Sequence, residues 1–195
     1  MIVNEIARFL ANDSSRLVVF IRHGEKDLLA GGPALITQQA KIASEQLGLS
    51  LRKFKLPIKI YSSPELRCVQ TAEILNFKIS EGCESDITIT SFLGQPGVQV
   101  RNNKRYLEIF NEHGARAMYT QWKNGKNYDA LRTTDELCIE LSKFLEKTTM
   151  ESKISLFVSQ SGTIAALGYA LGLRNYDPGN NDWVPFLDGF VLVCK

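Results

Sequence analysis

The sequence predicts an α/β fold, a three-layer sandwich in which helices cover both faces of a mainly parallel central sheet. Short apolar runs alternate along the chain with stretches whose apolar residues recur every three or four positions, as strands alternating with helices do. The run LVVFI at 17–21 is apolar throughout, which is typical of a strand buried on both faces. No repeat or linker divides the chain, so residues 1–195 are expected to form a single domain.

These patterns give the order of the elements. The expected strands are 17–21, 58–62, 87–90 and 154–159, and the expected helices are 2–10, 37–47, 64–75, 104–112, 115–123, 134–147 and 162–171. Gly48 is expected to end the second helix, because glycine favours the backbone conformation that follows a helix. Ser63 and Pro64 are expected to begin the third helix as its N-cap and first residue.

The later part of the chain departs from strict alternation. Residues from about 92 to 152 have mainly helical spacing, so they are expected to form a helical insertion before the last parallel strand. Thr133 and Glu136 have the spacing of a capping box for the final helix of this insertion. The tail VPFLDGFVLVC predicts two short strands joined by a tight turn at Asp188 and Gly189.

Composition excludes several classes of function. The 23 Lys and Arg residues nearly balance 21 Asp and Glu, so a nucleic-acid or membrane surface is not expected. No apolar stretch reaches the ~20 residues of a membrane span, and Glu5 and Arg8 interrupt the first apolar segment, which favours a cytoplasmic protein. The cysteines are spaced irregularly and are expected to be reduced structural thiols rather than metal ligands: Cys68, Cys83, Cys138 and Cys194.

Arg22, His23, Gly24 and Glu25 follow the first strand, and ligands of such sheets bind beyond the carboxyl ends of the strands. A histidine there can act as a nucleophile toward phosphorus, beside a fixed cation and a glycine that lets the backbone approach closely. On its own, this tetrapeptide favours a structural or surface histidine, because that is the commoner role at a strand end.

Two further segments follow strands in the same way. Ser63 and Arg67 are four residues apart, so they share a helix face at the positive end of the helix dipole, which suits an anion. A capped helix with a solvated arginine explains that spacing as well. Gln160 and Gly162 follow the fourth strand, where backbone N–H groups at a helix start can face a phosphate, although an ordinary polar turn is the alternative. Together the three segments converge on one pocket.

Three stretches of sequence carry a resemblance to a known family: FIRHGE at 20–25, YSSPELRCVQTAEIL at 61–75 and FVSQSGTIAALGYALG at 157–172. They resemble the histidine phosphatase, or phosphoglycerate mutase-like, superfamily, and the resemblance spans most of the chain. It implies a three-layer α/β fold in which His23 takes the phosphoryl group to form phosphohistidine. It also implies that Arg22 and Arg67 hold the phosphate, which two forked and permanently charged side chains can do.

The sequence departs from the family pattern at two places. Gln160 stands where the family has a second histidine, and a glutamine amide can donate a hydrogen bond but supplies no positive charge. Gln95 stands where many members have the glutamate that protonates the leaving group. Candidate replacements as proton donor are Glu25, Glu108, Glu112 and His113, although each is also expected as a helix-surface or exposed charge. Gln160 is compatible with either a natural change or a deliberate substitution.

Basic residues outside the motifs bear on the substrate. Lys26 follows the histidine motif, and Arg101, Lys104 and Arg105 cluster in the helical insertion, which favours a substrate with more than one anionic group or, alternatively, a solvated face. The sequence therefore predicts a phosphatase that acts through His23 on a phosphorylated small molecule or phosphoprotein, with activity weakened at Gln160. No metal or cofactor is expected, because the arginines supply the charge. The alternative is a non-catalytic protein that binds a phosphate ligand in a degenerate site.

Overall fold

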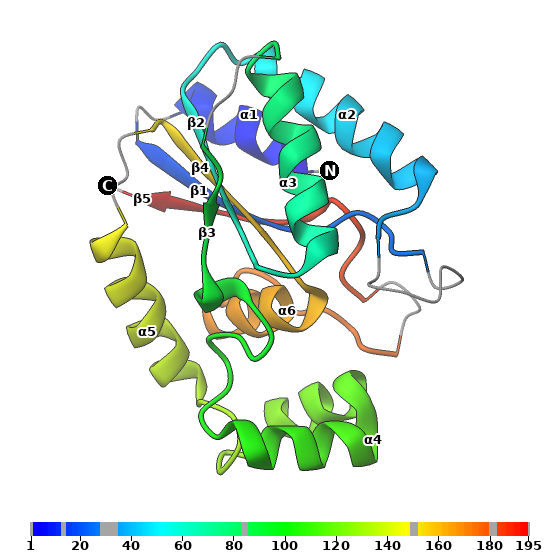
Figure 1. The fold of residues 1–195 in the computed structure, drawn as a ribbon. Coiled ribbons are helices and arrows are strands. Elements are labelled where there is room, and N and C mark those ends of the chain that lie inside the picture. The colour runs from blue at the N-terminus through cyan, green and yellow to red at the C-terminus, as the bar shows by residue number, and fades with distance from the viewer. Residues whose placement is uncertain are drawn as a thin grey trace.

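The computed structural model describes residues 2–12, 15–27, 35–82, 86–148, 152–179 and 183–194 (Figure 1). Its strands are β1 (Arg16–Arg22), β2 (Ile58–Ser62), β3 (Thr88–Ile89), β4 (Ile154–Ser159) and β5 (Gly189–Cys194). Its α-helices are α1 (Ile2–Asn12), α2 (Gln38–Arg52), α3 (Leu66–Ile79), α4 (Asn103–Lys123), α5 (Thr134–Lys147) and α6 (Ser161–Ala170). A short 3₁₀ helix, η1 (Ser91–Leu93), follows β3.

The strands form one sheet in the order β3-β2-β4-β1-β5. β4 pairs in parallel with both β1 and β2, and β2 pairs in parallel with β3. Only β5 runs antiparallel, along the outer side of β1. The predicted α/β fold with a mainly parallel sheet is therefore confirmed.

Successive residues of β1 point to opposite faces of the sheet, as the twofold period of a strand requires. Leu17, Val19 and Ile21 belong to an apolar core shared with α1, α2 and α3. Val18 and Phe20 belong to a second core shared with α4, α5 and α6. Figure 1 shows these two groups of helices on the two sides of the sheet. Burial on both faces explains why the sequence of β1 is apolar at every position rather than alternating.

Gly48 does not end α2, so that prediction is wrong. The helix continues to Arg52, and Gly48 lies buried against α3. A Cβ atom at Gly48 would lie 2.8 Å from the Cβ of Lys78 and 3.2 Å from the carbonyl oxygen of Leu75. The glycine therefore permits α2 and α3 to approach closely. In the sequence alone, a glycine needed for such a contact cannot be distinguished from a glycine that ends a helix.

The start of α3 also differs from the prediction. The helix begins at Leu66 with Glu65 as its N-cap residue, so Ser63 and Pro64 lie before it. The N–H of Ser63 instead donates to the carbonyl oxygen of Val158 at 3.0 Å, which extends the pairing of β2 with β4 by one residue. Sheet pairing thus outweighs the local preference of a Ser-Pro pair for a helix start.

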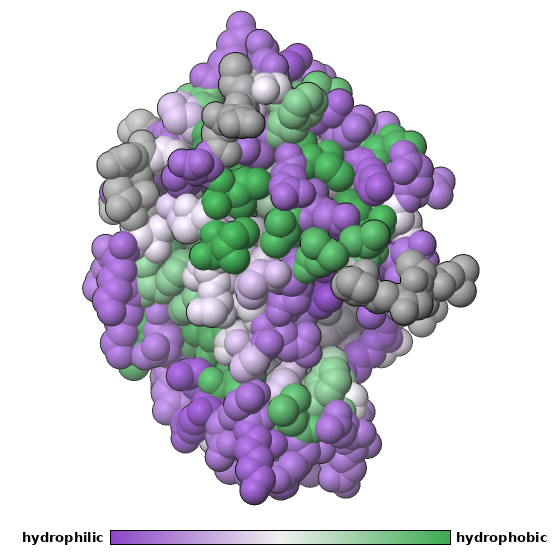
Figure 2. Space-filling view, in the orientation of Figure 1, coloured by the Kyte–Doolittle hydropathy of each residue, from purple (hydrophilic) through white to green (hydrophobic). Residues whose placement is uncertain are grey.

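The segment between β3 and β4 contains η1, α4 and α5, in agreement with the helical spacing of its sequence. The two helices expected at 104–112 and 115–123 are the two halves of α4, which bends at Gly114, where φ is 75°. The capping box of Thr133 and Glu136 at the start of α5 is confirmed. Figure 2 shows mainly hydrophilic residues on the outward surfaces of α4 and α5. Apolar residues such as Ile109 of α4 and Leu141 of α5 are buried in the body of the protein, whereas Leu107 and Ile139 are exposed.

The tail does not form the expected hairpin. Residues 183–188 contain no strand, and Gly189 is the first residue of β5. A Cβ atom at Gly189 would lie 1.9 Å from the carbonyl oxygen of Phe20, so close approach to β1 requires glycine there. None of the helices in the described ranges is long and apolar enough to cross a bilayer. Cys83 lies outside the described residues, and the other three cysteines are free thiols.

Candidate active site

The carboxyl ends of β1, β2 and β4 lie together at one edge of the sheet. β1 and β4 are in parallel register with Arg22 opposite Ser159, and the N–H of His23 donates to the carbonyl oxygen of Ser159 at 3.0 Å. β2 ends alongside them and leads to α3, whose second residue is Arg67. His23, Arg67 and Gln160, which lie far apart in the sequence, therefore meet at this edge.

The ring of His23 is fixed by hydrogen bonds on both nitrogens, and the residue is only 4% exposed. Its Nδ1 lies 2.6 Å from the carbonyl oxygen of Gly24, which can only accept, so Nδ1 carries the proton. Nε2 consequently keeps its lone pair and accepts a hydrogen bond from Nε of Arg67 at 3.0 Å. The N–H of Gly24 in turn donates to the hydroxyl of Thr71 at 3.0 Å, which holds the turn after β1 in place.

Burial lowers the pKa of His23 from 6.5 to about 3. This value already includes the smaller lowering by the positive charges of Arg67, Arg22 and Lys26 and the opposing effect of the hydrogen bond to Gly24. His23 is therefore a neutral imidazole at physiological pH. A neutral ring with a free Nε2 lone pair is the form that can attack phosphorus.

Gln160 is oriented by Arg67. An Nη2 hydrogen of Arg67 is donated to Oε1 of Gln160 at 2.8 Å, which places the amide oxygen toward the arginine. The opposite atom, Nε2, is buried and has no hydrogen-bond partner among the described residues. Since a buried donor without an acceptor is costly, this N–H₂ group is available to a ligand oxygen. Gln160 can therefore donate to a phosphoryl oxygen, as its sequence position suggested.

Arg22 is held by the segment before β5. Its guanidinium lies over the ring of Phe186, 3.6 Å from the ring centroid, and Nη1 donates to the carbonyl oxygen of Val184. Stacking on an aromatic face and a backbone hydrogen bond restrict the orientation of this long side chain. Neither Val184 nor Phe186 was predicted as part of the site, and their sequence, a short apolar tail, carried no signal for it.

Arg22, His23, Arg67 and Gln160 line a pocket of about 200 Å³. Its charged and polar wall at the sheet edge consists of Arg22, His23, Lys26, Arg67 and Gln160. Ser161, Gly162 and Thr163, the first three residues of α6, add a helix N-terminus with its unpaired backbone N–H groups. The geometry thus concentrates positive charge and hydrogen-bond donors around Nε2 of His23, as a phosphate site requires.

The helical insertion supplies the other wall of the pocket. It consists of Gly94, Gln95, Gln99, Tyr106, Phe110 and Ala115. Nε2 of Gln95 lies 3.5 Å from the hydroxyl of Tyr106, and burial raises the pKa of Tyr106 above its usual value, so that residue remains a phenol. Among the described lining residues, none carries a carboxylate. Two larger surface hollows elsewhere, of about 630 and 760 Å³, contain no histidine among their lining residues.

Ser63 and the four candidate proton donors, Glu25, Glu108, Glu112 and His113, lie outside this pocket lining. Ser63 is buried, and its hydroxyl donates to the carboxylate of Glu65. Glu25 is exposed, Glu108 forms an ion pair with Arg105 at 3.0 Å, and His113 is an exposed residue of α4. The spacing of acidic residues in the sequence therefore did not identify a proton donor in this pocket.

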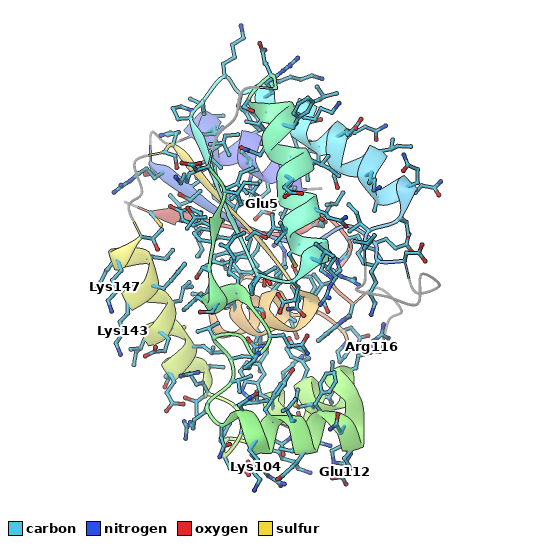
Figure 3. All side chains as sticks on the ribbon, viewed as in Figure 1. Glu5, Lys104, Glu112, Arg116, Lys143 and Lys147 are labelled. Carbon is cyan, nitrogen blue, oxygen red and sulfur yellow. The ribbon has the colours of Figure 1, made fainter. Side chains whose placement is uncertain are left out.

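The basic cluster of the insertion also lies away from the pocket lining. Arg101 pairs with Glu136, and Arg105 pairs with Glu108 and Asp129, so opposite charges already neutralise both. Lys104 points outward from the end of α4 in Figure 3. The alternative of a solvated charged face therefore describes these residues better than a second anion site. No cluster of His, Cys, Asp and Glu with metal-binding geometry occurs in the described part of the chain.

Comparison with known proteins supports the assignment of the fold. Residues 18–179 match the sequence pattern of the histidine phosphatase superfamily (branch 1). The structure is similar to the mycobacterial glucosyl-3-phosphoglycerate phosphatase bound to VO3, with a TM-score of 0.52 and 19% identity over 90% of this chain and 88% of that one. It is also similar to a putative alpha-ribazole-5'-P phosphatase of Escherichia coli, with a TM-score of 0.50 and 15% identity over 83% and 82% of the two chains. No curated protein matches in sequence.

Proposed function

Because the chain belongs to the histidine phosphatase superfamily, we propose that it hydrolyses phosphate monoesters through a phosphohistidine on His23. The observation that carries this proposal is the state of the His23 ring. Its proton is on Nδ1, its Nε2 lone pair accepts a hydrogen bond from Arg67, and burial keeps the ring neutral. A phosphate bound by Arg22 and Arg67 places phosphorus in front of that lone pair.

In the first step, Arg67 turns its Nε hydrogen from His23 to a phosphate oxygen, and the Nε2 lone pair attacks phosphorus. The N–P bond forms as the P–O bond to the organic group breaks, and the electron pair leaves with that oxygen. The ring becomes cationic, so its Nδ1–H bond to the carbonyl oxygen of Gly24 strengthens. The arginines and the amide of Gln160 stabilise the charge on the equatorial oxygens.

In the second step, water attacks the phosphohistidine. An O–P bond forms as the N–P bond breaks, inorganic phosphate is released, and His23 returns to its neutral form. The alcohol formed in the first step takes its proton from solvent in this proposal, because the described lining holds no carboxylate to supply it. With a neutral glutamine at 160 in addition, the rate of the first step is expected to be low compared with a site that has a cationic donor there.

Trapping the intermediate tests the proposal. The protein is mixed with a ³²P-labelled aryl phosphate and denatured in alkali, which preserves phosphohistidine, and protein-bound label is counted. Label is expected on the unmodified chain and on His113→Asn, which removes the exposed histidine, but not on His23→Asn. Turnover that survives in His23→Asn would overturn the proposed mechanism.

A second candidate function is phosphate binding without catalysis. The observation that favours it is the combination of Gln160 with a described lining that lacks a carboxylate. Vanadate binding without label or turnover, in both the unmodified chain and Gln160→His, would establish this second function instead.

A further inference from the structure

The phosphate pocket continues beneath α4 into a second cavity of about 40 Å³. The two share four lining residues: Gln99, Tyr106, Ala115 and Gly162. The rest of the second cavity is apolar or aromatic, and its lining residues are Met118, Tyr119, Trp122, Leu131, Ala166 and Trp183. A ligand whose phosphate lies against His23 can therefore extend its organic group into this space, which is called the aromatic cavity below.

The polar groups of two aromatic lining residues, Tyr119 and Trp122, are already engaged. The hydroxyl of Tyr119 donates to the carbonyl oxygen of Ala165 at 3.3 Å, and the indole N–H of Trp122 donates to the carbonyl oxygen of Arg132 at 2.6 Å. Trp183 packs edge-on against Tyr119 with ring centroids 4.8 Å apart. The rings thus offer their apolar surfaces, which suit a hydrocarbon group and leave hydroxyls of a sugar without partners.

A second anionic group on the substrate would find no free cation in this direction. Of the described residues that line the two cavities, the cationic ones are Arg22, Lys26 and Arg67, all on the wall that surrounds His23. A single phosphate bound next to His23 would engage these three cationic side chains. The substrate therefore resembles an apolar phosphate ester more than a bisphosphate or a phosphorylated acid.

The ease of bond breaking points in the same direction. With no carboxylate in the described lining, the leaving oxygen departs without a neighbouring acid, and this favours an oxygen that carries negative charge well. A phenol ionises near pKa ~10, whereas water ionises near ~15.7, so an aryl oxygen leaves far more readily than one of water-like basicity. An aromatic organic group therefore both fits the apolar cavity and provides an oxygen that can leave without a neighbouring acid.

Building on the proposed function, we infer that the substrate is a phosphate monoester of a small phenol, whose ring passes Ala115 and enters the aromatic cavity. The volume of about 40 Å³ equals the space of roughly three waters at ~10–15 Å³ each, which holds the far edge of a ring. The phosphate and the near edge of the ring occupy the larger pocket.

Binding of phosphonates, which are not hydrolysed, separates recognition from leaving-group chemistry. Benzylphosphonate, methylphosphonate and phosphonoacetate are titrated as competitors of vanadate. Benzylphosphonate is expected to bind at least about 10-fold more tightly than methylphosphonate, because burying one apolar group in a matching pocket increases affinity by at least this factor. Ala115→Leu and Ala166→Leu fill the cavity from two different helices and are expected to remove this preference. Ala117→Leu is the matched control, because Ala117 is exposed on the same helix as Ala115.

Each outcome decides the question. Equal binding of the benzyl and methyl compounds, or tighter binding of phosphonoacetate than of benzylphosphonate, would overturn the inference while leaving the proposed function intact. Retention of the benzyl preference in both filled variants would also overturn it. If neither vanadate nor any phosphonate binds, the proposed function itself fails, and the inference fails with it.

Discussion

Nε of Arg67 donates a hydrogen bond to Nε2 of His23 at 3.0 Å, so one arginine is expected both to hold the phosphate and to shield the attacking atom. In the free protein, the lone pair that attacks phosphorus is occupied by this N–H. Since the guanidinium has further donors, an incoming phosphate can engage Arg67 before the Nε hydrogen leaves His23. Substrate binding and exposure of the proposed nucleophile, His23, are thereby expected to be coupled through Arg67.

Replacement of Arg67 tests this coupling. Arg67→Ala is expected to weaken vanadate binding about 10- to 100-fold, because a charged hydrogen-bonded contact contributes about 1.5–3 kcal/mol. Arg67→Lys keeps the charge but not the forked geometry, so its affinity is expected to lie between the two. Arg52→Ala, which breaks an exposed ion pair between the end of α2 and Glu81 in the turn after α3, serves as the control. Equal affinities in all four proteins would contradict the assignment of Arg67 to the phosphate.

The residue at position 160 is expected to control the rate of the proposed first step. Gln160→His is expected to raise kcat roughly 10²-fold if the imidazole acts in its protonated form, because it adds charge next to the transferring oxygens. Vanadate affinity is expected to change less, since the amide of Gln160 already occupies a donor position. Steady-state hydrolysis of an aryl phosphate, with His23→Ala as the blank, measures both forms. A turnover of 1–10³ s⁻¹, the order of ordinary enzymes, in the unmodified chain would show that glutamine is competent there.

Acid is expected to destabilise the protein through His23. Burial lowers the pKa of His23 from 6.5 to about 3, so between these values an unfolded chain holds a proton that the folded chain does not. Stability therefore falls as the pH falls below 6.5, by about 2 kcal/mol at pH 5 for a shift of this size. Urea unfolding at pH 7 and pH 5 should show this loss in the unmodified chain and in His113→Asn, and a smaller loss in His23→Asn. The same loss in all three would assign it to other groups.

The close contact of α2 and α3 at Gly48 is expected to tolerate no side chain. Gly48→Ala would bring a methyl group within 2.8 Å of the Cβ of Lys78, so the free energy of unfolding should drop by about 1–3 kcal/mol. Gln46→Ala, at an exposed position of α2, should leave it nearly unchanged. If Gly48→Ala were as stable as Gln46→Ala, the two helices would have room to separate.

Much of the fold was predictable because its signals are local. The apolar run of β1, the ends of β2 and β4, and the capping box of α5 at Thr133 and Glu136 all agree with the prediction. Gly48 and Gly189 misled because glycine serves close packing of distant segments as well as turns, and one sequence does not distinguish the two uses.

The site divides in the same way. His23, Arg67 and Gln160 follow strand ends, so the rule for parallel sheets predicted their meeting. Tyr106, Phe110, Met118, Tyr119 and Trp122 come from α4, whereas Leu131, Ala166 and Trp183 come from other segments, so the aromatic cavity depends on packing that no local pattern encodes. The basic residues Arg101 and Arg105 were misleading for a related reason. Two of their acidic partners, Glu136 and Asp129, lie on other segments, and these pairings are visible only in the fold.

The attachment of Arg22 to Val184 and Phe186 has a consequence for how the protein is made. Arg22 and Val184 are 162 positions apart. Arg22 is therefore synthesised well before the segment that orients its side chain. Chains emerge from the ribosome N-terminus first, and β1, β2 and β4 can pair before residues 183–194 are available. A nascent chain with most of its sheet in place therefore still has an unsupported Arg22. Incomplete nascent chains are therefore expected to bind anions weakly, and full affinity should appear only after residues 183–194 have been synthesised and folded.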